Sequence, residues 1–167
     1  MKKSIVSLFT LMFLVSTICA PVKAVEVPQV EASNVIATDE FVVHLTDETT
    51  RYIYPVNVRT QILYTKSDGL GFYICAVTGL PVITELKGFV EYNTSLDGDR
   101  GIMVRYSESN DPAGGSIEWL EYTGNKYDSG VKITASFSGE VGADEGILGD
   151  DAVFDGYFFR TIEATIP

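Results

Sequence analysis

The feature that most constrains the fold is the alternation of apolar and polar residues along short segments of the chain. The clearest case is 131–138 (VKITASFS), where Val131, Ile133, Ala135 and Phe137 take alternate positions and polar residues take the others. Successive side chains of a β-strand point to opposite faces, so this pattern predicts a strand with one face towards a core and one towards water.

The segment 82–92 (VITELKGFVEY) has the same period, and Gly88 within it indicates a bulge or a close backbone approach. Its polar face holds Glu85, Lys87, Phe89 and Glu91. We interpret these charged residues as a solvated face with cross-strand ion pairs.

Further strands are predicted at 41–46, 60–65, 71–78, 102–107, 116–122 and 157–166. Residues 71–78 (GFYICAVT) are apolar on both faces, which is typical of a central, fully covered strand. Residues 140–155 have the composition of an acidic, glycine-bearing loop, and no segment supports a long amphipathic helix. About eight short strands with turns between them predict an all-β, antiparallel sandwich or barrel.

The first 24 residues have the features of an export signal. A short basic start is followed by an uncharged, mostly apolar run, and Val22-Lys23-Ala24 offers a cleavage site. We expect removal after Ala24, with Ala20 as the second choice, and a protein secreted to the outside of a bacterial cell. Residues 25–39 are a linker or a loosely attached first strand, and 40–167 form the β-sandwich domain.

Charge limits the classes of partner. The 167 residues include 12 Lys and Arg against 23 Asp and Glu, a net charge of −11. Lys2, Lys3 and Lys23 lie in the signal, which holds no acidic residue, so its removal lowers the net charge to −14. Such a surface repels nucleic acid and anionic lipid. We therefore expect no nucleic-acid partner, and the mature chain has no segment apolar enough to span a membrane.

Cysteine and histidine are scarce. Cys19 lies in the signal, so Cys75 alone remains, and His44 is the single histidine. These numbers exclude a zinc site of several histidines or thiolates. A Cys75–His44 or Ser-His-Asp arrangement is formally open, but no catalytic signature accompanies it. We expect Cys75 to be a small buried side chain, His44 to face solvent, and the protein not to be an enzyme.

Residues 155–162 (DGYFFRTI) resemble the penultimate strand of immunoglobulin-like and fibronectin-type sandwiches. The resemblance implies an immunoglobulin-like sandwich of about eight strands. It also implies a tyrosine-corner role for Tyr157, whose hydroxyl would bond to nearby backbone. It carries no activity with it.

Two groups of residues are candidate ligand sites. Acidic loops offer hard oxygen ligands for a divalent cation such as calcium, provided that the loops converge at one end of the domain. Their members are Asp97, Asp99, Asp150, Asp151 and Asp155. Tyr122 and Tyr127 flank a turn and are a candidate aromatic platform for a sugar or peptide, whereas Trp119 is predicted to lie in the core.

The sequence thus predicts a secreted, monomeric, non-catalytic binding module with no required cofactor. Its partner is an unidentified protein or cell-surface polymer. The alternatives are a carbohydrate-binding module and a calcium-stabilised adhesion-type domain.

Overall fold

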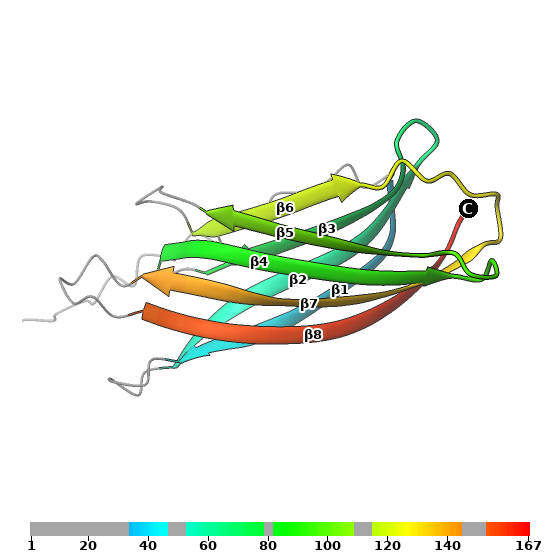
Figure 1. Ribbon diagram of the computed structural model, residues 1–167. Helices are drawn as coiled ribbons and strands as arrows, with labels where there is room; N and C mark the ends of the chain where they lie inside the picture. Colours follow the sequence, from blue (N-terminus) through cyan, green and yellow to red (C-terminus); the bar gives the residue numbers. More distant parts are fainter. Residues whose placement is uncertain (1–33, 47–52, 79–81, 109–114, 145–152) are drawn as a thin grey trace, which may run out of the picture.

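The structure, a computed structural model, describes residues 34–46, 53–78, 82–108, 115–144 and 153–167. These residues form eight antiparallel strands (Figure 1). The strands are β1 (Val35–Thr46), β2 (Ile53–Thr65), β3 (Gly69–Val77), β4 (Val82–Thr94), β5 (Arg100–Glu108), β6 (Ser116–Tyr122), β7 (Lys132–Asp144) and β8 (Val153–Thr165). The prediction of an all-β, antiparallel domain is confirmed.

All eight strands belong to one sheet with the order β5-β4-β7-β8-β1-β2-β3-β6. Its halves, β5-β4-β7-β8 and β1-β2-β3-β6, face each other across the core. Among the described residues, a single residue pair, Thr46–Asp155, joins them. The end strands β5 and β6 approach each other, with Arg105 Nη1 4.0 Å from Glu121 Oε2. The sheet is therefore nearly closed and barrel-like, and is not clearly a sandwich.

The core lies between the two halves. Inward-facing side chains of β4 and β7 meet those of β2, β3 and β6, and the largest fully buried ones include Phe72, Ile74, Leu86 and Phe137. Phe72 and Phe137 make an edge-on contact with ring centroids 5.9 Å apart. Since Ile133, Ala135 and Phe137 are all buried and Lys132 is exposed, the alternation predicted for 131–138 is confirmed.

Two opposed glycines mark close approaches, Gly88 between the two halves of the sheet and Gly139 within its own half. Gly88 of β4 lies directly opposite Gly139 of β7. A Cβ on Gly88 would lie 2.8 Å from Ile74 Cδ1, and one on Gly139 would lie 2.2 Å from the Lys87 carbonyl oxygen. The close approach predicted at Gly88 is present, whereas the register shift in β4 lies between Ile83 and Glu85.

Several strands extend beyond their predicted limits. β1 begins at Val35, inside the segment expected to be a linker or first strand. β7 continues to Asp144 and β8 begins at Val153, so strand structure takes up much of the loop expected at 140–155. Strands β7 and β8 are extended because Val141 and Ala143 are buried in the core and the β7–β8 pairing continues to Asp144.

Within the described ranges, none of the elements is a helix of the length and apolar character required to cross a membrane.

Candidate functional site

The outward-facing side of β5, β4, β7 and β8, here called the β4/β7 outer face, carries two rows of side chains. In each row the residues lie directly opposite one another on neighbouring strands. The first row consists of Val104, Phe89, Ser138 and Phe159. The second row consists of Tyr106, Lys87, Glu140 and Tyr157. An apolar row and a polar row therefore run side by side across four strands.

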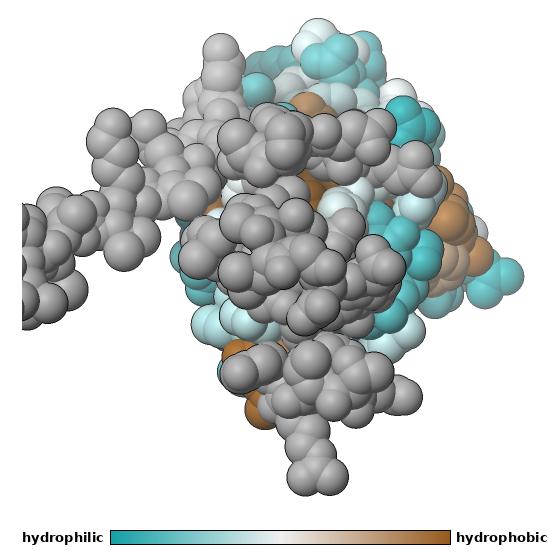
Figure 2. All heavy atoms as spheres, turned by 90° about the vertical axis from the view of Figure 1, so that its left-hand side faces the viewer, coloured by the Kyte–Doolittle hydropathy of each residue, from teal (hydrophilic) through white to brown (hydrophobic). Residues whose placement is uncertain are grey.

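Large apolar side chains on this face are open to solvent. Val104 is 70% exposed, Phe159 64% and Tyr157 73%, and Ile102 and Tyr106 are exposed as well. Apolar residues also reach the surface in Figure 2, at its right-hand edge, the side on which this half of the sheet lies. Single exposed apolar residues are common, but a group gathered on one face marks an interaction surface.

A hollow of about 650 Å³ lies on this face between the two rows. Phe89 and Val104 line one side, Tyr157 the other, and the short residues Ser138 and Gly139 lie between them. Phe89 and Phe159 are two strands apart, roughly 10 Å, because neighbouring strands are spaced at about 4.8 Å. A ring or an aliphatic side chain of a ligand therefore fits above Ser138.

The polar row is held by one chain of hydrogen bonds. The Tyr106 hydroxyl donates to Glu85 Oε2 at 2.9 Å, and the Tyr157 hydroxyl donates to Glu140 Oε1 at 3.2 Å. Between them, Lys87 Nζ donates to Glu85 Oε1 at 3.3 Å and to Glu140 Oε2 at 3.0 Å. The cross-strand ion pairs predicted for this face are present. The hydrogen bond to Glu140, followed by the one to Glu85, raises the pKa of Lys87, so its ammonium group stays charged.

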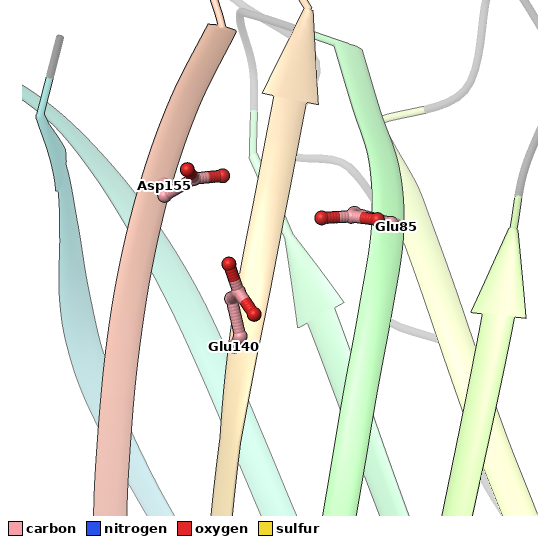
Figure 3. A group of neighbouring side chains, drawn as sticks. All are labelled: Glu85, Glu140 and Asp155. Carbon is pink, nitrogen blue, oxygen red and sulfur yellow. The ribbon is translucent and has the colours of Figure 1, made fainter.

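Three carboxylates converge beside these hydrogen bonds. Glu85 of β4, Glu140 of β7 and Asp155 of β8 each offer an oxygen, and these atoms lie within 4.8 Å of one another. Figure 3 shows the three groups turned towards a common space beside β7. Partial burial, and then the charges of Glu140 and Glu85, raise the pKa of Asp155. Lys87 neutralises one of the three charges, so the group keeps a net negative charge that favours a cationic ligand.

The described members of the predicted acidic site do not converge. Asp97 and Asp99 lie in the turn between β4 and β5, where Thr94 Oγ1 donates to Asp99 Oδ2 at 2.9 Å. Asp155 lies beside Glu85 at the other end of β4, and nine residues of strand, roughly 30 Å, separate Glu85 from Thr94. The remaining two members, Asp150 and Asp151, lie outside the described residues.

The two tyrosines of the predicted platform lie away from the β4/β7 outer face. The Tyr122 ring is partly buried, and a Cβ on Gly71 would lie 2.6 Å from its Cδ1 atom. Tyr127 is partly buried against the core, burial raises its pKa, and its carbonyl oxygen accepts a 2.7 Å hydrogen bond from the Tyr64 hydroxyl. Trp119 is in the core, as predicted.

Tyr157 also differs from the role that the resemblance implies. Its single hydroxyl proton goes to the Glu140 carboxylate, so the hydroxyl does not donate to a backbone carbonyl. His44 is exposed on β1, as expected. Cys75 is fully buried on β3, and burial raises the pKa of its thiol, which makes it a poor nucleophile.

Sequence reasoning did not select Glu85 and Glu140 as site residues. The sequence pattern places Glu85 on a solvated face and Glu140 in a loop. A usable signal was present, because Phe89 lies among the charged residues of 82–92 and Phe159 alternates with Phe158. An aromatic residue on the polar side of an amphipathic strand indicates a surface that contacts a partner as well as solvent.

Comparison of the chain with protein families, curated proteins and solved structures gave no significant match.

Proposed function

We propose that the exported protein is a non-catalytic binding module that holds its partner on the β4/β7 outer face. The observation that carries the proposal is the gathering of exposed apolar side chains around one hollow, next to three converging carboxylates. The partner is a protein segment that carries apolar and basic side chains.

The apolar half of this recognition rests on Phe89, Val104 and Phe159. Burying an apolar side chain of the partner in the hollow removes it and its neighbours from water, at about 25 cal/mol per Å² of apolar surface. Tyr157 combines a large exposed ring with a hydroxyl, the kind of side chain that dominates protein interfaces.

The basic half rests on Glu85, Glu140 and Asp155. Lys87 provides an internal example, because its ammonium group bonds two of these carboxylates and lies 5.8 Å from the centre of the Tyr106 ring. A lysine or arginine of the partner meets the same chemistry at Asp155, to which no side chain of the described residues donates a hydrogen bond. The net charge of the chain, −11, attracts such a partner over a longer range.

The test is calorimetric titration of the protein with a short peptide in which lysine alternates with phenylalanine. We expect Phe159→Ser and Val104→Ser each to lower the affinity by about tenfold or more, because truncated anchor residues typically cost over 1 kcal/mol. Val42→Ser is the matched control, since Val42 is exposed on β1 in the other half. Equal affinities for the three variants contradict the proposal.

Two alternatives predict different results. The exposed rings of Tyr106 and Tyr157 favour a carbohydrate-binding module as one alternative. Such a module binds neutral oligosaccharides, and its binding is insensitive to the charge of a peptide. A calcium-stabilised domain melts at a higher temperature in calcium and at a lower one with a chelator, because binding to the folded state alone stabilises it. In that second case, Asp155→Asn removes the response to calcium.

A further inference from the structure

Strand β5 is an edge strand of the sheet, with one side unpaired. Its backbone pairs with β4 along one side, and among the described residues no backbone hydrogen bond joins its other side to another strand. The strand nearest in space is β6, which pairs only with β3. Its Trp119 packs on the inner side of Gly88, so β6 lies against the inner surface of β4. The Arg105–Glu121 contact of 4.0 Å between two exposed side chains is too long to close the seam.

The side chains of this edge strand are apolar and exposed. Ile102, Val104 and Tyr106 share the outer side of β5, and all three are open to solvent. Natural sheets usually protect such an edge with lysine, proline or a bulge, because unpaired backbone groups and apolar side chains together recruit another strand. Between Gly101 and Ser107, β5 has a single charged side chain, Arg105, and no proline, and its pairing with β4 shows no register shift.

We propose that β5 pairs antiparallel with β5 of a second copy of this chain, about a two-fold axis at Val104. We choose a second copy of the chain as the partner because β5 is self-complementary, and a two-fold interface places the same strand opposite itself in reverse order. In this register Val104 meets Val104 of the second copy, and Ile102 meets Tyr106 at two equivalent places. Apolar pairs directly opposite one another across antiparallel strands are stabilising.

Charge supports the same register. The pairing that brings Val104 opposite itself also brings Arg100 opposite residue 108, which is a glutamate. Moving the two-fold axis by one residue, to 103 or 105, places Ile102 or Tyr106 opposite Val104 and removes the pairing of Arg100 with residue 108. On the inner side, Arg105 comes opposite Met103, an apolar neighbour that does not repel it.

The dimer goes beyond the proposed binding function and departs from the monomer that the sequence favours. It joins two β4/β7 outer faces edge to edge, so that the apolar rows of the two copies continue across the axis. Two linked sites bind a repetitive polymer or a partner with several copies of one segment more tightly than either site alone. The dimer interface and the binding of a single peptide share Val104, and they remain separable because Phe159, on which peptide binding also rests, lies on β8 and outside the dimer interface.

The test is sedimentation equilibrium of the exported chain over a range of concentrations. We expect a monomer–dimer equilibrium, and Val104→Lys raises its dissociation constant by at least about tenfold, because two ammonium groups then lie directly opposite. Phe159→Lys is the matched control, with the same change of charge on the same face but outside β5, and it leaves the equilibrium unchanged.

A mixing experiment tests the register itself. Val104→Lys and Val104→Glu are each monomeric alone, whereas an equal mixture of the two forms a heterodimer, because only this register brings position 104 opposite itself. Val104→Cys gives a second readout, a disulfide-linked dimer on mild oxidation, which Phe159→Cys does not form. A wild-type chain that stays monomeric at every concentration overturns the proposal. So does a dimer that survives Val104→Lys.

Discussion

The outer surfaces of the two halves of the sheet differ in how they treat apolar side chains. On β3, the outward-facing Tyr73, Cys75 and Val77 are no more than 5% exposed. On β5 and β8, the outward-facing Val104 and Phe159 are 70% and 64% exposed. The same kind of residue at the same kind of strand position is thus structural in one half and available for binding in the other. Alternation in the sequence therefore assigns a residue to a face of the sheet. Whether that face is buried or exposed to solvent decides whether the residue is structural or available for binding.

The largest expected effect lies on the inner surface, which both halves share. Phe137→Asp places an unpaired charge among fully buried side chains and should unfold the domain. Lys132→Asp, on the exposed side of the same strand, should change the free energy of unfolding by no more than about 0.5 kcal/mol. Circular dichroism and thermal melting of both variants check the assignment of faces, and similar behaviour of the two contradicts it.

A matched pair of tyrosines compares the two outer surfaces directly. Tyr73 donates a 2.9 Å hydrogen bond to Glu118 and is buried, whereas Tyr157 donates a 3.2 Å bond to Glu140 and is exposed. Tyr73→Ala should lower the free energy of unfolding by about 3–5 kcal/mol, as for other large buried aromatic residues. Tyr157→Ala should change it by about 0.5 kcal/mol or less, while weakening peptide binding. Urea denaturation of both variants measures the difference, and equal losses refute the comparison.

The glycine pair under the hollow gives an intermediate effect. Gly139→Ala brings a methyl group against the Lys87 carbonyl oxygen and the Phe158 ring, so the strands must shift. Overpacking of this kind costs about 1–3 kcal/mol. Ser138→Ala, at the neighbouring position of β7, serves as a control, because Ser138 is only partly buried and the change removes an oxygen atom without adding a methyl group. If both variants melt like the wild type, β4 and β7 are less tightly joined at this point than the distances indicate.

The smallest effect concerns the carboxylate group and has a defined pH dependence. The pKa of Asp155 is raised in the folded state, so its contribution to stability is fully present below the unfolded pKa, near about 4, and is lost as the pH rises through the folded value. Asp155→Asn should therefore raise the melting temperature slightly at neutral pH and not at pH 3. A gain that is the same at both pH values shows that charge repulsion is not its cause.

The sequence predicts much of the fold because each strand carries its own local signal. Residues 131–138 alternate strictly, and 71–78 are apolar at nearly every position, which is why their burial could be predicted. The closing of the sheet into a barrel-like form could not, because it depends on strand pairs far apart in the sequence, such as Thr46 with Asp155.

The site was less predictable than the fold for the same reason. Glu85, Glu140 and Asp155 come from three strands, and only the order β4-β7-β8 brings them together. Their spacing in the sequence follows no motif. The predicted acidic loops include Asp155 but neither glutamate of the group, because loop composition does not reveal at which end of the domain each loop lies.

The central claim is that the β4/β7 outer face holds the partner, and amide chemical-shift mapping tests it most directly. The uniformly ¹⁵N-labelled protein is titrated with the alternating lysine–phenylalanine peptide. We predict that the largest shifts occur at Phe89, Ser138, Glu140 and Phe159, and that the amides of Tyr73 and Cys75 keep their positions. Shifts centred on β3, or spread evenly over both halves of the sheet, contradict the account.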